Sequence, residues 1–171
     1  AEYCGEPTPE SRMNRFAVGI EYDGSDFAGW QTQPGLAAVQ SSLEMALSRV
    51  LDHPVEATGA GRTDAGVHAR AQVAHFQATA MRSERALVLG ANTYLPEGIA
   101  LRWARQVPEH FHARYSALSR TYRYCILNRA GRGPLSRNRA AFIHRRMEVE
   151  PMQAAAQLLI GTHDFSAFRA A

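Results

Sequence analysis

A glycine-rich run, GAGRTDAGVHAR at Gly59–Arg70, places the carboxylate of Asp64 two residues after Arg62. Glycine adopts positive φ or lets a ligand approach the backbone, at an entropic cost that an ordinary strand or helix avoids. The three glycines of the run therefore favour a site at which a turn positions a carboxylate. A second interpretation remains open, in which the run is a surface turn, Asp64 is solvated and Arg62 is its exposed ion-pair partner.

The spacing of this run excludes the common nucleotide-binding loops. Its G-x-G is followed by Arg-Thr-Asp, so it lacks both the dinucleotide spacing and the Gly-Lys-Ser/Thr ending of a phosphate loop. We therefore expect no nucleotide cofactor. The spacing of His53, His68 and His75 around Asp64 fits no zinc signature, so we expect no metal site either.

Four segments stand in order along the chain: IEYDGSDFAGWQTQ from Ile20, GAGRTDAGVHARAQVAHF from Gly59, FHARYSALSRTYRYCILN from Phe111 and HDFSAFR from His163. Together they closely resemble the tRNA pseudouridine synthase A (TruA) family, over roughly Arg15 to Ala171. The resemblance implies an isomerase that converts uridine to pseudouridine in the tRNA anticodon stem-loop, at positions 38 to 40 of tRNA nomenclature, without a cofactor. It also implies a homodimer that shares the tRNA.

The resemblance also assigns roles to single residues. Asp64 matches the catalytic aspartate, a nucleophile that attacks either C1′ of the ribose or C6 of the base. Arg62 matches the arginine that pairs with this aspartate, which favours its charged form, and that holds the target nucleotide out of the stack. The ring of Tyr122 is expected to pack against the uracil. The residues expected to bind substrate are Tyr122, Arg120, His68, Arg145 and Arg146.

The charge is distributed unevenly, and this favours an RNA partner. Residues 1–61 carry three arginines against nine acidic residues, whereas residues 62–146 carry fifteen arginines against four. A basic block of this kind suits a phosphate backbone, because the planar guanidinium group can bind phosphate with two hydrogen bonds. Aromatic residues are interleaved with these arginines, although most of them are expected in the core.

Length and composition are typical of a globular, cytoplasmic protein. The chain has 171 residues, of which 46% are apolar, enough for a sizeable core. No apolar run approaches the roughly 20 residues of a membrane span, and the first residues contain no apolar signal core. Two cysteines provide neither a disulfide framework nor a zinc site.

Strands and helices are predicted in alternation. Apolar residues alternate over 16–22, and helical spacing follows over 37–51. Ser83 is a plausible N-cap for a helix that ends before Pro96, and Pro151 and Gly161 are expected at the start and just after the end of a last helix. Asp64 is expected on a strand-to-strand connection. The remaining strands are predicted over 72–77, 99–103, 120–127, where a sheet would place Tyr122, and 140–144.

This alternation predicts an α+β fold with helices packed on a mostly antiparallel sheet. The family resemblance implies a pseudouridine synthase fold built from ferredoxin-like halves, of which the second is incomplete here. We expect a flexible tail over 1–13, a first half with the catalytic loop over 14–129, and a basic loop with the start of the second half over 130–171. The alternative function is a non-catalytic RNA-binding fragment or a decayed relative that lacks the rest of the pocket.

Overall fold

The computed structural model describes residues 13–168, which form two compact units that divide after Tyr122. The predicted tail lies outside the described residues except for Met13. The predicted boundary between residues 129 and 130 remains a prediction.

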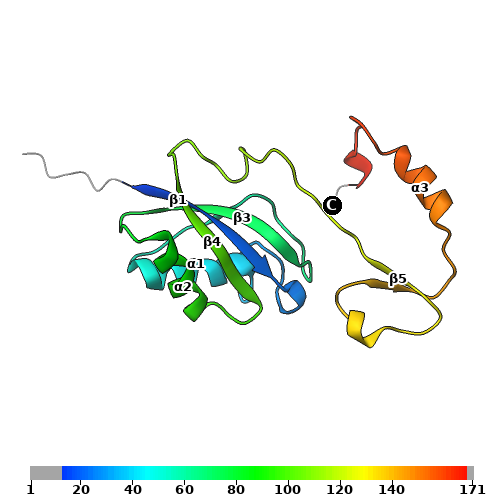
Figure 1. Ribbon diagram of the computed structural model, residues 1–171, viewed down its shortest axis with the longest axis horizontal. Helices are drawn as coiled ribbons and strands as arrows, with labels where there is room; N and C mark the ends of the chain where they lie inside the picture. Colours follow the sequence, from blue (N-terminus) through cyan, green and yellow to red (C-terminus); the bar gives the residue numbers. More distant parts are fainter. Residues whose placement is uncertain (1–12, 169–171) are drawn as a thin grey trace, which may run out of the picture. The chain divides into compact units, whose positions relative to one another are not determined.

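The first unit is a four-stranded antiparallel sheet with two helices on one face (Figure 1). The strands follow the order β2-β3-β1-β4 across the sheet, and the chain order β1-α1-β2-β3-α2-β4 is that of a ferredoxin-like unit. This confirms the predicted α+β class and the antiparallel sheet. The elements are β1 (Asn14–Tyr22), α1 (Val39–Leu51), β2 (Thr58–Gly59), β3 (Ala69–Ala78), α2 (Glu84–Tyr94) and β4 (Ile99–Val107).

The predicted periodicities place the core between the sheet and the helices. Alternate residues of β1, from Phe16 to Tyr22, point into one apolar cluster with Leu43 and Leu47 of α1. The hydroxyl of Ser83 accepts a hydrogen bond from the Ala86 amide at 3.2 Å, so the predicted N-cap of α2 is confirmed. Asp64 lies between β2 and β3, on the predicted strand-to-strand connection.

The strand predicted over 120–127 is wrong. Only β5 (Ile126–Asn128) is a strand, and it pairs in parallel with β6 (Ala141–Ile143) in the second unit. Residues 120–125 belong to no strand, although the Cys125 carbonyl accepts a hydrogen bond from the Ala141 amide at 2.8 Å. Tyr122 is therefore not positioned by a sheet, and its side chain is 71% exposed.

The last helix also begins earlier than predicted. Helix α3 covers Val149–Gln157, so Pro151 is its third residue instead of its first. Proline is tolerated there because the amides of the first helical turn have no partner within the helix. Gly161 has a φ of 113° but lies beyond the helix end rather than directly after it.

A buried histidine fixes the segment that follows β4. His75 of β3 is 7% exposed, and its Nδ1 accepts a hydrogen bond from the Ala113 amide at 3.2 Å. Its ring lies 4.6 Å from the His112 ring, and Arg15 Nη1 donates to the Phe111 carbonyl at 2.8 Å. These contacts attach residues 111–113, which lead to Arg114, to the sheet.

The position of His75 predicts a pH-dependent stability. Burial lowers the pKa of His75 from its ordinary value of 6.5, and the neighbouring His112 and Arg15 lower the pKa further. The imidazole of residue 75 therefore binds a proton more readily in the unfolded chain than in the folded one. The stability that comes from keeping His75 buried and neutral is complete above pH 6.5 and is lost as the pH falls below 6.5. We expect the free energy of unfolding in urea to decrease on acidification, and the decrease to be smaller in His75→Gln. The same replacement at exposed His110 should leave the pH profile unchanged, and an equal profile in both variants would contradict this role.

Candidate active site

The turn that carries Asp64 is held by the loop that follows β1. The Trp30 amide donates to the Thr63 carbonyl at 2.9 Å, and the Gly66 amide donates to the Phe27 carbonyl at 3.3 Å. The hydroxyls of Tyr22 and Thr63 are hydrogen-bonded at 2.8 Å. Residues on both sides of Asp64 are therefore fixed through backbone contacts.

Two glycines of this loop allow the close approach. A Cβ on Gly29 would lie 2.5 Å from the Thr63 carbonyl oxygen, and Gly29 has a φ of 107°, which other residues rarely adopt. A Cβ on Gly24 would lie 2.1 Å from the Val67 carbonyl oxygen. Larger residues at either position would push the turn away from the loop.

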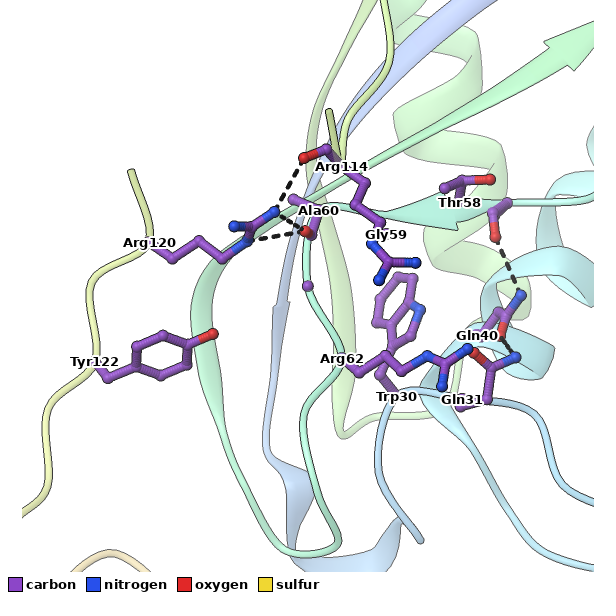
Figure 2. A pocket seen from close by; sticks show the side chains of 12 residues that line it. Trp30, Gln31, Gln40, Thr58, Gly59, Ala60, Arg62, Arg114, Arg120 and Tyr122 are labelled. Atoms are coloured by element: carbon purple, nitrogen blue, oxygen red, sulfur yellow. Dashed lines mark hydrogen bonds between the residues drawn. The ribbon is translucent and has the colours of Figure 1, made fainter. Parts of the chain in front are cut away.

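The start of the turn is also held by Gln72 and Arg120. Gln72 Nε2 donates to the Gly61 carbonyl at 2.6 Å. The Nε and Nη2 of Arg120 donate to the Ala60 carbonyl at 2.9 and 2.7 Å, and Nη2 also donates to the Arg114 carbonyl at 3.0 Å (Figure 2). Arg120, predicted to bind substrate, thus joins two backbone segments in this structure, and its contact with substrate remains a prediction.

Asp64 itself is exposed at the turn. Its carbonyl accepts a hydrogen bond from the Val67 amide at 3.2 Å, which closes the turn, and its side chain faces solvent. Within residues 13–168, Asp64 and Arg62 form no ion pair with each other, so the expected pairing remains a prediction. The side chain of Arg62 extends past Trp30 toward Gln31 (Figure 2).

Two tyrosines approach the same turn. Tyr22 is buried, and burial raises its pKa; hydrogen bonds to Thr63 and Gln72 lower the pKa, and the nearby Tyr122 raises it. The hydroxyl of Tyr122 lies 3.7 Å from the position that a Cβ on Gly61 would occupy. The sequence pattern placed Tyr22 only on the buried face of a strand. A buried tyrosine hydroxyl needs a hydrogen-bond partner, and this need was the signal in the sequence that Tyr22 contacts another segment.

The other predicted substrate-binding residues lie in different places. His68 Nδ1 lies 3.0 Å from the Asp23 carboxylate and 3.1 Å from the Gly24 amide nitrogen, so its ring connects the end of the turn to the loop. Arg145 and Arg146 lie after β6 in the second unit, where both are exposed and the Arg145 carbonyl accepts a hydrogen bond from Asn128 Nδ2 at 2.6 Å. The roles of His68, Arg145 and Arg146 remain predictions.

A pocket of about 400 Å³ lies beside the turn. Arg62, Arg120 and Tyr122 line it together with Arg114 and Trp30, two residues that sequence reasoning did not assign to a site. Across residues 13–168, no group of three or more His, Cys, Asp or Glu side chains could hold a metal ion. Within the same residues, no helix has the length and apolar character of a membrane span.

Comparison with known proteins finds one matching family and many related sequences. Residues 19–116 match the family described as tRNA pseudouridine synthase. Relatives named tRNA pseudouridine synthase A include those of Methylococcus capsulatus, 56% identical over 91% of this chain, and Coxiella burnetii, 54% identical over 93%. A third, from Buchnera aphidicola, is 51% identical over 91% of this chain. The chain spans only 58 to 61% of the length of these relatives.

The contact between Gly24 and Val67 predicts that a side chain at residue 24 destabilises the turn. In Gly24→Ala the added methyl group must displace a backbone carbonyl, which we expect to lower the free energy of unfolding by about 1–3 kcal/mol. Hydrogen exchange of the amides over 60–68 should accelerate. Gly131→Ala is the matched control, because a Cβ there meets nothing within 4 Å. Unchanged exchange over 60–68 in Gly24→Ala would show that this contact does not hold the turn.

Proposed function

Because the chain belongs to the tRNA pseudouridine synthase family, we propose that it converts uridine to pseudouridine in the anticodon stem-loop of tRNA, at positions 38 to 40. The observation that carries the proposal is the Asp64 turn. Its backbone is fixed on both sides while its carboxylate remains open to a macromolecular substrate. A fixed nucleophile of this kind lowers the entropic cost of reaching the reactive geometry.

In the proposed reaction, Asp64 forms a covalent adduct at C1′ of the ribose or at C6 of the base. The bond from N1 to C1′ breaks, the uracil turns, and a bond forms from C5 to C1′ as the carboxylate leaves. The hydrogen at C5 departs as a proton and N1 gains one, so substrate and product are isomers and no cofactor is needed. A carboxylate can act in this way because it both attacks and leaves readily.

The charge of Arg62 supports the same assignment. Arg62 is exposed two residues before Asp64, and a long side chain there can turn its guanidinium group to the carboxylate. A positive charge at that distance keeps a carboxylate ionised when RNA excludes water from the site. The same group can hold the target nucleotide outside the base stack, where the reaction requires it.

Tyr122 provides an aromatic surface beside this turn. Its side chain is 71% exposed, and its hydroxyl lies close to Gly61. Stacking of a base on an exposed aromatic ring contributes roughly 1–3 kcal/mol in single-strand binding, which offsets part of the unstacking cost. We assign Tyr122 to the uracil of the everted nucleotide, with Arg120 and His68 as further contacts to the RNA.

The resemblance supports a shared assembly, whereas the expected location rests on length and composition. We assign it to the cytoplasm as a homodimer that shares the tRNA. Sedimentation of the chain with and without tRNA decides the assembly.

Replacing the nucleophile gives the most direct test. Asp64→Asn should lower turnover by more than about a thousandfold while tRNA affinity changes little, because the amide has nearly the same shape but is not a nucleophile. Turnover is measured as release of tritium from C5-labelled uridine in tRNA. Asp52→Asn is the matched control, since Asp52 is an exposed carboxylate whose left-handed conformation asparagine also accepts. Activity near that of the unaltered chain in Asp64→Asn contradicts the assignment, and binding without any tritium release in the unaltered chain favours a non-catalytic RNA-binding protein.

The exposed pair Arg145 and Arg146 predicts a salt effect. Replacing both with glutamine should weaken binding to many RNAs alike and reduce the slope of log affinity against log salt by roughly 0.7–0.9 for each phosphate that is no longer neutralised. The double replacement of Arg82 and Arg85 removes the same charge from α2 and its N-terminal flank, and serves as the control. Equal slopes for the two variants would place Arg145 and Arg146 outside the RNA interface.

A further inference from the structure

The pocket beside the Asp64 turn does not include Asp64 among its lining residues. Trp30 forms part of its lining and is only 2% exposed. The backbone of β2 lies directly against the indole, because a Cβ on Gly59 would lie 2.6 Å from Trp30 Cε2. Trp30 and Gly59 thus form a packed part of the lining, and Arg62 of the turn lies beside them (Figure 2).

The charged residues that line this pocket are all arginines: Arg62, Arg114 and Arg120. The guanidinium group of Arg120 is bonded to two backbone carbonyls. In contrast, the guanidinium groups of Arg62 and Arg114 make no hydrogen bond or ion pair with any other side chain or carbonyl of residues 13–168. Two such cations beside one pocket, with no carboxylate in its lining, favour a phosphate as the occupant.

A chain of carboxamides fixes which atoms of Gln31 face the pocket. Gln40 Oε1 accepts from the Thr32 amide at 3.2 Å, and Gln40 Nε2 donates to the Ala57 carbonyl at 3.1 Å and to Glu44 at 3.0 Å. A backbone amide only donates and a carbonyl only accepts, so the orientation of Gln40 is determined. Gln31 must then direct its Nε2 to Gln40 Oε1, which lies 2.9 Å away.

This orientation leaves Gln31 with its carbonyl oxygen and one N–H for another partner. A carboxamide that offers one acceptor and one donor side by side matches the edge of a nucleobase. A volume of about 400 Å³ lies within the usual range for small-ligand sites. The pocket therefore combines the carboxamide of Gln31, the guanidinium groups of Arg62 and Arg114, and the exposed ring of Tyr122.

We propose that this pocket binds a second, non-reacting nucleotide of the RNA beside Arg62, with its phosphate on Arg114 and its base edge on Gln31. The proposal rests on the proposed function for the identity of the RNA. Since Arg62 belongs both to this pocket and to the Asp64 turn, the bound nucleotide lies close to the target uridine in the RNA. Gln31 and Arg114 then help to select which uridine reaches Asp64.

The test uses the full chain and a fluorescent anticodon stem-loop RNA in which one loop nucleotide at a time lacks its base. Binding is measured by anisotropy for the unaltered chain and for Gln31→Ala. We expect one abasic position to weaken binding to the unaltered chain by about tenfold and to have no further effect in Gln31→Ala. If every abasic RNA loses the same affinity in both proteins, Gln31 does not read a base and the proposal is overturned.

Arg114 is tested with the complete RNA. Arg114→Gln should weaken binding by about tenfold, and Arg114→Lys, which keeps the charge but not the planar group, should restore part of the loss. Arg82→Gln removes an equal charge from an exposed site outside the pocket and is the control. A loss in Arg114→Gln no larger than in Arg82→Gln overturns the phosphate assignment. Urea midpoints equal to that of the unaltered chain show that the variants fold.

The two proposals fail in different ways. Absence of tritium release from the unaltered chain overturns the proposed function, whereas the anisotropy measurements still decide whether the pocket binds a nucleotide. If tritium is released but Gln31→Ala shows no coupling to any base, the function stands and the pocket assignment falls.

Discussion

The backbone contacts that hold the Asp64 turn are the constraint on which the site depends. Trp30 and Phe27 bind the turn through main-chain hydrogen bonds, and Gly24 and Gly29, which have no side chains, allow the loop to approach the turn closely. Because these contacts use the backbone, the side chain of Asp64 can remain exposed while its position stays fixed. A nucleophile for a large RNA needs both properties, since the substrate must reach it and must meet it at a fixed place.

The arginines around this turn divide into two kinds. Arg120 uses its guanidinium group to join Ala60 to the segment after β4, so part of the positive charge at the site is structural. Arg62 and Arg114 keep their groups directed at the pocket. The number of arginines therefore does not give the number of RNA contacts. A planar guanidinium group with several N–H donors also binds backbone carbonyls.

The segment after β4 depends on a long-range contact of its own. His75 belongs to β3, whereas Ala113 belongs to no strand. The hydrogen bond that His75 accepts from the Ala113 amide therefore lies outside any strand pairing. This contact, together with that of Arg120, places Arg114 beside the pocket and leads the chain to Tyr122. Residues far apart in the sequence thus meet at one site, although the segment from Phe111 to Tyr122 contains no strand.

Local patterns in the sequence determined the elements of the first unit and the place of Asp64 on a connection between two strands. Apolar alternation in β1, helical spacing in α1 and the Ser83 cap of α2 each act over a few residues, so their signals survive in the sequence alone. Tyr122 shows the limit, because its segment alternates as a strand would, yet a strand also needs a neighbour to accept its hydrogen bonds. Only the tertiary structure decided that neighbour, the direction of Arg62 and the atoms that Gln31 presents, since each depends on contacts outside the local pattern.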